Sequence, residues 1–342
     1  MSLNFGSDDY ADPAIYAQER QNIFHRAWQL LGPVSMVAAP GQYITADIAN
    51  MPIIVIRGQD GVLRGFVNVC PHRGATLLKG QGSCAAIRCP YHDAQFGDEG
   101  QLTTTEWFGD PTPDELASLR LTPISTKEWR GLLLAAISPF EDAVTQMGDA
   151  PDQVGETPIQ TYTHAERRSV TVEANWKSYF DQYNEIWHTP QIHPADKNVG
   201  IQGYRAEAMR GLIRMTTAPG DGAGADAAYY GGKWMQMWPN WTLVLLKGGM
   251  KTVRINPVAA DKFIADHDFY FADMGPETAE ERKRVADATL SIFMQDSALI
   301  ESLMRNYRLG VYKPGPMHPH HERALIEYQR RIKAALNSGE TV

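Results

Sequence analysis

Four residues in two short segments could bind a metal. Cys70 and His72 lie in "CPHRG", and Cys89 and His92 lie in "CPYH". Two cysteines and two histidines suit one tetrahedral zinc ion, or a two-iron cluster with two cysteines on one iron and two histidines on the other. Zinc sites usually group like ligands, whereas each segment here supplies one cysteine and one histidine. The spacing therefore favours an iron–sulfur cluster over structural zinc.

A second set of candidate ligands lies in "NWKSYFDQYNEIWHTPQIHP", residues 175–194. We expect a helix interrupted by Pro190, in which a 3.6-residue repeat places Asp181, Glu185 and His188 on one face. His193 follows just after the break. Two such histidines can converge on one metal, and a distant carboxylate would complete the two-histidine, one-carboxylate set that holds non-haem Fe(II). That set leaves coordination positions open for dioxygen and substrate.

Together, the two segments resemble those of Rieske non-haem iron oxygenase α subunits. The resemblance implies that Cys70, His72, Cys89 and His92 bind a Rieske [2Fe–2S] cluster. In residues 175–194, the resemblance rests on Asn175, Trp176, Lys177, Glu185, Trp187, His188 and His193. Gln182 stands where the family often has Asn. The family's third iron ligand is an Asp on a later helix, and Asp296 in "SIFMQDSALIESLMRNYRLG" matches it. Asp266 and Asp268 are weaker candidates because "FIADHDFYFAD" predicts a strand.

The cluster segments depart from the family pattern in one respect. The oxygenases usually continue the second segment as His-Gly-Trp, whereas Asp93 and Ala94 follow His92 here. A third cysteine, Cys84, lies between the segments, and we expect it to be a small buried hydrophobic residue. The pattern lacks the extra cysteine pair of high-potential Rieske proteins, so the resemblance is to the lower-potential domains of oxygenases and ferredoxins.

The resemblance also implies partners and a route for electrons. In the family, the acid three residues before the first iron histidine, here Glu185, bridges to a cluster histidine of a neighbouring subunit, here His92. This arrangement implies a head-to-tail ring, commonly a homotrimer. A separate reductase, with or without a ferredoxin, is expected to deliver electrons from NAD(P)H to the cluster, and O2 is the cosubstrate.

The elements that must position these residues predict an α+β fold. Short β-rich segments such as "QYITADI" and "MPIIVIRG" surround the cluster ligands and predict an all-β Rieske domain over residues 28–150. Residues 1–27 are expected to form an N-terminal helical segment, with Asp12 as N-cap and Pro13 in the first turn. By resemblance, residues 151–342 form a helix-grip catalytic domain, an antiparallel sheet covered by helices.

Composition narrows the possible partners. The chain has 342 residues, a net charge of −8 and no dense Lys/Arg segment, so we expect no nucleic-acid partner. No apolar segment approaches the roughly 20 residues that span a bilayer, and no signal peptide is evident, so we expect no membrane partner and a cytoplasmic location. Only three cysteines are present, which suits a reducing compartment.

Aromatic residues in "YYGGKWMQMWPNWTLVLL" are candidates for substrate binding. A trimethylammonium group could lie against Tyr229, Tyr230, Trp234, Trp238 or Trp241 through cation–π attraction. The alternative is core packing, because the spacing of Trp234, Gln236 and Trp238 is also that of a half-buried strand.

These inferences predict an oxygenase component of a multicomponent Rieske monooxygenase. It would hydroxylate or oxidatively N-demethylate a small organic substrate, with a betaine- or carnitine-like quaternary ammonium compound as the candidate. Family members that act on such compounds often carry Glu at the position of Glu185, whereas most other members carry Asp there. Aromatic-ring cis-dihydroxylation is the alternative among enzymes, and an electron-transfer protein without catalytic iron is the alternative of another class.

Overall fold

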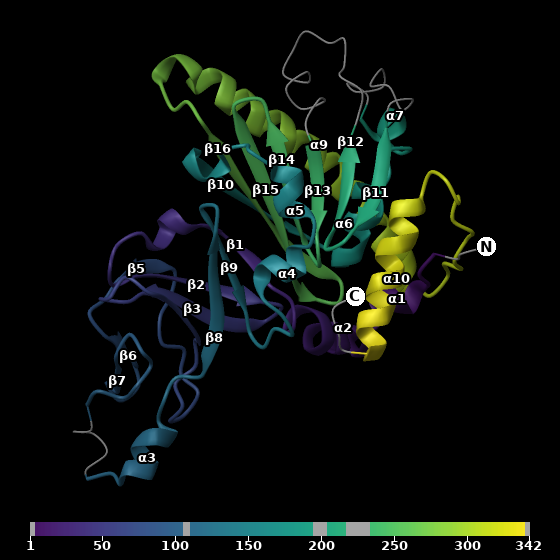
Figure 1. The fold of residues 1–342 in the computed structure, drawn as a ribbon. Helices are drawn as coiled ribbons and strands as arrows, with labels where there is room; N and C mark the ends of the chain where they lie inside the picture. Colours follow the sequence, from purple (N-terminus) through teal and green to yellow (C-terminus); the bar gives the residue numbers. More distant parts are fainter. Residues whose placement is uncertain (1–3, 105–109, 194–203, 217–232, 339–342) are drawn as a thin grey trace. The chain divides into compact units, whose positions relative to one another are not determined.

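The chain forms two compact units, as Figure 1 shows. The computed structural model describes residues 4–104, 110–193, 204–216 and 233–338. One unit is His25–Pro139, and the other combines Met1–Phe24 with Phe140–Val342. The α+β fold class is confirmed, but this division differs from the predicted one. Residues 1–24 do not stand apart from the second unit, and the second unit begins at Phe140 rather than near residue 150.

The first unit is built on a seven-stranded antiparallel sheet with the order β1-β9-β8-β4-β3-β2-β5. Its larger strands are β1 (Gln29–Pro33), β2 (Gln42–Ile48), β3 (Met51–Arg57), β4 (Leu63–Val67), β8 (Pro123–Trp129) and β9 (Leu132–Ala136), and β5 (Gln81–Ser83) forms one edge. The strands β6 (Ile87–Arg88) and β7 (Gln95–Phe96) form a separate hairpin, and α3 spans Pro113–Ser118. The hairpin carries the second cluster segment at its turn, because Cys89 follows β6 directly.

The second unit contains another seven-stranded antiparallel sheet, with the order β10-β16-β15-β14-β13-β12-β11. The strands are β10 (Thr163–Val172), β11 (Arg205–Met209), β12 (Leu212–Thr216), β13 (Lys233–Met237), β14 (Trp241–Leu246), β15 (Gly249–Ala259) and β16 (Lys262–Phe271). Nearly every residue of β13, β14 and β15 is buried, so both faces of the sheet are covered at its centre.

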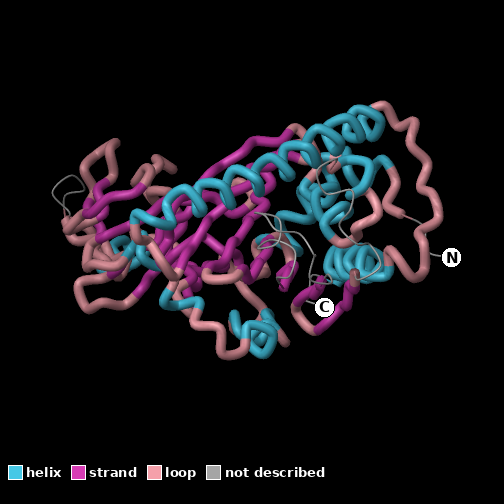
Figure 2. The backbone as a smooth tube through the Cα atoms, turned by 90° about the horizontal axis from the view of Figure 1, so that it is seen from above, coloured by secondary structure: helices cyan, strands magenta, loops and turns pink. Residues whose placement is uncertain are grey.

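Helices pack on this second sheet. The long helix α9 (Ala279–Arg308) crosses one face, as Figure 2 shows. There the ring of Phe293 meets the ring of His267 on β16 edge to face, with centroids 4.5 Å apart. The other helices of the unit are α1 (Ser7–Ala11), α2 (Pro13–Glu19), α4 (Ala143–Met147), α5 (Ala150–Val154), α6 (Trp176–Tyr183), α7 (Thr189–Ile192) and α10 (Arg323–Ser338). Among the described residues, no helix is both long and apolar enough to cross a membrane.

The N-terminal segment is attached to helix α6 by a buried polar cluster. Asp12 caps α2 as predicted, and α2 runs directly into a π-helical turn, Arg20–Phe24, so the expected helical segment ends at Phe24. The Glu19 carboxylate accepts a 2.8 Å hydrogen bond from Trp176 Nε1 and pairs with the ammonium group of Lys177, and all three side chains are buried. Residues 1–24 therefore belong to the second unit, which explains why they are not a separate segment.

Asn175 starts α6. Its side-chain oxygen accepts a 2.9 Å hydrogen bond from Lys177 N, and its Nδ2 donates to the Tyr10 and Ala260 carbonyl oxygens. An N-cap satisfies one of the unpaired N–H groups of the first helical turn. The Asn-Trp-Lys segment therefore fixes where α6 begins and which surfaces it contacts, while the metal-binding residues come later in the chain.

Asp181 lies against Tyr10 and Gln329 and not beside Glu185 and His188, so its predicted position was wrong. Its carboxylate accepts hydrogen bonds from Tyr10 (2.6 Å) and from Gln329 Nε2 (3.0 Å). Burial raises the pKa of Asp181 to about 6, although the two hydrogen bonds and the charge of Lys177 oppose that shift. The raised pKa means that the charged form of Asp181 destabilises the fold near neutral pH.

We expect Asp181→Asn to stabilise the protein at pH 7–8 and to have little effect below about pH 4. A folded pKa above the unfolded value of 3.8 costs stability as the pH rises through about 6, and Asn does not titrate. The upper limit of the gain in the free energy of unfolding is about 2–3 kcal/mol. Melting temperatures of wild type and variant across this pH range test the prediction, and a difference that does not vary with pH would contradict it.

Candidate metal centres

The first candidate centre lies between α6 and α7. The helix α6 ends at Tyr183, so Glu185 and His188 lie in the turn that follows and not on one interrupted helix. Pro190 lies in the first turn of α7 instead of breaking a helix, which is a position that proline favours. His188 immediately precedes α7 and His193 immediately follows it. A single helical turn therefore holds the two histidines on the same side.

The two histidines converge on Asp296 of α9. His193 Nε2 lies 3.1 Å from Asp296 Oδ1, and His188 Nε2 lies 3.5 Å from the same oxygen. One potential ligand atom from each residue lies within 4.8 Å of the other two, and this is the one such group of three among the described residues. Asp296 Oδ1 is buried and makes no hydrogen bond with the described residues, as expected for an oxygen whose partner is a metal ion.

The other ring nitrogen of each histidine has an acceptor. Glu185 Oε1 pairs with His188 Nδ1, and Gln295 Oε1 lies 2.9 Å from His193 Nδ1. A carboxylate or amide oxygen accepts a hydrogen bond, so each Nδ1 carries the proton and each Nε2 keeps its lone pair toward Asp296. Two neutral imidazoles and one carboxylate, oriented in this way, fit a non-haem Fe(II) site.

The alternative carboxylates are engaged elsewhere. Asp268 is buried on β16 between His164 (2.8 Å) and Arg167 (2.7 Å), and Asp266 accepts a hydrogen bond from Ser169. The prediction that this segment is a strand is confirmed. Neither acid belongs to the group formed by His188, His193 and Asp296.

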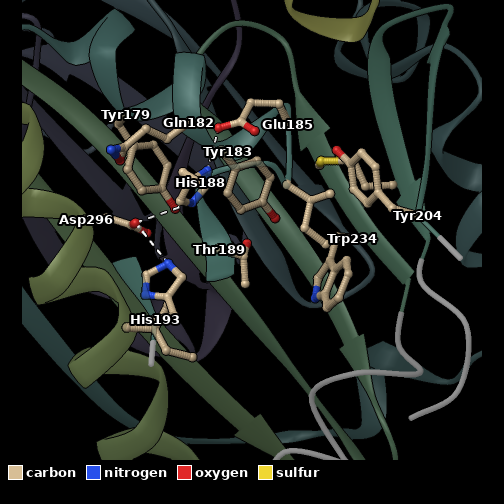
Figure 3. Close-up of a pocket in the computed structure, with 13 residues that line it drawn as sticks. Tyr179, Gln182, Tyr183, Glu185, His188, Thr189, His193, Tyr204, Trp234 and Asp296 are labelled. Carbon is tan, nitrogen blue, oxygen red and sulfur yellow. Dashed lines mark hydrogen bonds and ion pairs between the residues drawn. The ribbon is translucent and has the colours of Figure 1, made fainter. Parts of the chain in front are cut away.

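A cavity opens beside these three residues. Figure 3 shows His188, His193 and Asp296 on one side, Tyr204 and Trp234 on the other, and Tyr183 between them. The other described residues that line the cavity are Tyr179, Gln182, Glu185, Ile186, Thr189, Met215 and Ile292. Burial, together with the nearby charge of Glu185, raises the pKa of Tyr204, so its hydroxyl stays protonated.

Of the three predicted substrate tryptophans, only Trp234 lines this cavity in the described part of the chain. The strand β13 ends at Met237, so Trp238 does not continue the alternation and lines a separate cavity beside α4. Trp241 pairs across the sheet with Met237, whose side chain lies on the face opposite Trp234, and is 1% exposed. Trp238 and Trp241 are therefore placed away from the cavity, while Tyr229 and Tyr230 lie outside the described residues.

The second candidate centre consists of two matching loops in the first unit. Cys70 N donates to Ala75 O (2.8 Å) and Cys70 O accepts from Gly74 N (2.9 Å), while Cys89 N donates to Ala94 O (2.8 Å) and Cys89 O accepts from Asp93 N (3.1 Å). Gly74 and Asp93 occupy equivalent positions with left-handed backbone, at φ +76° and +58°. Asp93 thus takes a conformation that favours glycine and that Asp tolerates better than most residues. The departure from the family pattern preserves the shape of the loop.

The loops bring the two cysteines next to each other and the two histidines next to each other. Cys70 and Cys89 are both 2% exposed, and the rings of His72 and His92 lie 4.8 Å apart. Burial raises the pKa of the Cys70 thiol, and the backbone N–H of His72 opposes the shift. Buried sulfurs of this kind become thiolates when a metal binds them. The donor set of two sulfurs and two imidazoles fits a Rieske cluster.

Cys84 packs beside this cluster site without joining it. Its side chain is partly buried against the core that contains Cys70 and Cys89, and burial raises the pKa of its thiol. It is not disulfide-bonded. The expected role as a small hydrophobic residue agrees with this packing.

Comparison with known protein families accounts for both centres. The family model of the ring hydroxylating alpha subunit (catalytic domain) matches residues 159–338, which is more than half of the chain. The chain belongs to this family. A Rieske [2Fe-2S] domain model matches residues 27–118. The predicted resemblance to Rieske oxygenase α subunits is therefore confirmed, as are the oxidoreductase class and the cofactors, a [2Fe–2S] cluster and a mononuclear iron.

Several relatives are named for the compounds on which they act. The carnitine monooxygenase oxygenase subunit of Escherichia coli (strain K12) is 28% identical over 89% of this chain and 84% of the relative. The chloroplastic choline monooxygenase of Beta vulgaris is 25% identical over 90% of this chain and 71% of the relative. The crystal structure of the quaternary ammonium Rieske monooxygenase CntA with L-carnitine matches with a TM-score of 0.83 at 23% identity, covering 98% of this chain and 95% of that one.

The same fold occurs in a dioxygenase, the alternative class of enzyme considered from the sequence. Naphthalene 1,2-dioxygenase with indole bound matches this α subunit with a TM-score of 0.82 at 19% identity, covering 99% of this chain and 93% of that one. The likeness to solved structures thus extends over both monooxygenases and dioxygenases. Fold alone does not separate the two activities.

Sequence reasoning missed Gln295 and several residues that line the cavity beside the candidate iron ligands. Gln295 orients His193, and Tyr179 and Tyr204 line the cavity. Gln295 directly precedes Asp296, so a search for polar neighbours of each ligand could have found it. No sequence pattern indicated Tyr204, because its approach to the cavity depends on how β11 is placed beside the other strands.

Proposed function

We propose that this chain is the oxygenase component that hydroxylates or oxidatively N-demethylates a quaternary ammonium compound. His188, His193 and Asp296 would hold the mononuclear iron, and Cys70, His72, Cys89 and His92 would hold the cluster. When bound, the iron supplies the dioxygen chemistry, with electrons that arrive from NAD(P)H through a separate reductase. The relatives that act on carnitine and choline support the substrate class.

The observation that carries this proposal is the lining of the cavity next to the proposed iron ligands. Tyr183, Tyr204 and Trp234 contribute aromatic rings, and Glu185 contributes a carboxylate. Aromatic faces attract a quaternary ammonium group, which has no N–H and cannot satisfy hydrogen-bonding groups. Burial among the rings would also exclude water from the methyl group that reacts. If an N-methyl carbon is hydroxylated, the carbinolamine loses formaldehyde, and the net reaction is demethylation.

Glu185 is proposed to have two roles. Its carboxylate holds the proton of His188 Nδ1 in place, and it also accepts a hydrogen bond from Trp187 N. These contacts fix the orientation of the His188 ring. By family resemblance, the same carboxylate would bridge to His92 of a neighbouring subunit in a head-to-tail homotrimer. The reductase partner follows from membership of a multicomponent family, whereas the trimer and the cytoplasmic location remain proposals.

The electron-transfer alternative is disfavoured by the second unit itself. A protein that only carries electrons has no need to orient two histidines and a carboxylate around one point, each with its own supporting contact. The ring-dihydroxylation alternative is left as an outcome of the experiment, because aromatic side chains can also pack against a neutral ring.

A single-turnover experiment tests the proposal without the natural reductase. The iron-loaded protein is reduced chemically, exposed to O2 with a carnitine-, betaine- or choline-like compound, and analysed by product mass and formaldehyde release. We expect product from at least one ammonium compound, and we expect Trp234→Ala to weaken its binding by about 1–2 kcal/mol while Trp234→Phe weakens it less. Products from neutral aromatic compounds alone would replace the proposal with dihydroxylation.

A further inference from the structure

The cavity contains a buried amide that has no hydrogen-bond partner among the described residues. Gln182, near the end of α6, lines the cavity and is 8% exposed. Neither its Nε2 nor its Oε1 makes a hydrogen bond there. Leaving a buried group of this kind unpaired costs free energy, and few buried polar groups in native proteins stay unpaired. A ligand in the cavity would provide the missing partner.

The position of Gln182 indicates which part of a ligand it contacts. Figure 3 shows Gln182 near His188, across the cavity from Trp234. The described lining contains the carboxylates of Glu185 and Asp296 but no lysine or arginine. Negative charge and aromatic faces suit the ammonium end of a ligand, whereas the amide can donate to an oxygen atom.

We propose that Gln182 donates a hydrogen bond to the oxygen group of the substrate, a hydroxyl or a carboxylate. It would thereby select oxygen-bearing quaternary ammonium compounds over simple tetraalkylammonium ions. This inference rests on the proposed function and adds a specificity-determining residue to it. A site built to hydrogen-bond an oxygen discriminates against an analogue that lacks it, because its own polar group is then left unpaired.

Calorimetric binding without O2 tests the inference on the iron-loaded protein, before any turnover. The probes are tetramethylammonium, which has no oxygen, choline, which has a hydroxyl, and glycine betaine, which has a carboxylate. The wild type should bind at least one of the two oxygen-bearing probes more tightly than tetramethylammonium. Gln182→Leu should weaken binding of the preferred probe roughly 3–10-fold if that probe is choline, or about 10–100-fold if it is betaine. The affinity for tetramethylammonium should change less than about threefold.

A second substitution distinguishes the two oxygen groups. Gln182→Glu keeps the shape but adds negative charge and removes the N–H donors, so it should repel glycine betaine. A choline hydroxyl can instead donate to the new carboxylate, so choline binding should persist. Loss of betaine binding with choline binding retained would support a direct contact between residue 182 and the oxygen group.

Asn184→Leu is the matched control. Asn184 is another buried amide whose side-chain atoms make no hydrogen bond with the described residues, but it is not among the residues that line the cavity. Asn184→Leu should leave the preference for oxygen-bearing probes unchanged, and iron content and near-ultraviolet circular dichroism report whether each variant is folded. The inference is overturned if Gln182→Leu weakens all three probes equally, leaves the preference intact, or matches Asn184→Leu. If the wild type binds neutral aromatic compounds and no ammonium probe, the proposed function has failed first, and this inference falls with it.

Discussion

Replacing Asp296 with alanine should remove the mononuclear iron and abolish product formation while the cluster remains. The iron content should fall from about three atoms per chain to about two, with acid-labile sulfide unchanged. Asp296 supplies the only carboxylate of the described three-residue group, and both histidines aim Nε2 at its Oδ1. Without it, two neutral imidazoles face Fe(II) with no charge to balance the ion.

The measurement is metal analysis together with the EPR signal of the reduced cluster. Asp287→Ala provides the matched control, because Asp287 lies on the same helix but pairs at the surface with Arg168 and Lys283. Surface ion pairs contribute little, so this variant should keep its iron and its activity. Full iron occupancy in Asp296→Ala would show that another group completes the site, and the proposed ligand set would be wrong.

The cluster segments were the most predictable part of the chain. Their ligands are close in sequence, and the loop that carries them is closed by local hydrogen bonds such as Gly74 N to Cys70 O. Local geometry of this kind depends on neighbouring residues, so spacing alone carries the information. Even the unusual Asp93 keeps the backbone conformation that the loop requires.

The candidate iron ligands His188, His193 and Asp296, which the structure brings together, were named from the sequence, but their structural context was not predicted. The helical repeat could be counted through residues 175–189, but α6 ends at Tyr183, which moves Glu185 and His188 into a turn. Asp181 shows the same limit, because its hydrogen bond to Tyr10 links residues 171 positions apart. A contact of such sequence separation is decided by tertiary packing, which a repeat along one segment does not encode.

The substrate side was the least predictable part. Trp234 and Trp241 lie on opposite faces of the sheet because the turn between β13 and β14 sets the cross-strand register. A shift of one residue would exchange the faces, and the composition of the segment is the same in either case. The role of Gln182 could not be predicted either, since it depends on side-chain orientation in a cavity formed by distant elements.

Glu185→Gln should leave both metal sites filled and yet lower product formation roughly 100-fold. The amide oxygen can still accept the hydrogen bond of His188 Nδ1, so the histidine stays oriented and iron is retained. The negative charge is lost, and the amide nitrogen cannot accept from Trp187 N. Glu185→Asp, which keeps the charge, should restore part of the activity. Measuring cluster reduction and then product formation in a single turnover shows which step is impaired. We expect the cluster to be reduced normally and product formation to be impaired.

Mixed oligomers then decide whether the proposed bridge of Glu185 lies within or between chains. One subunit carries Glu185→Gln with an intact cluster, and the other carries Cys70→Ser with an intact Glu185. If electrons pass between subunits, a mixed ring contains interfaces where an intact cluster of one chain faces an intact Glu185 of the next, and activity should return. If they pass within one chain, every subunit is defective and mixing restores nothing. Full turnover by homogeneous Glu185→Gln protein would contradict both cases, because the carboxylate would then be only structural and the ring arrangement would lose its main support.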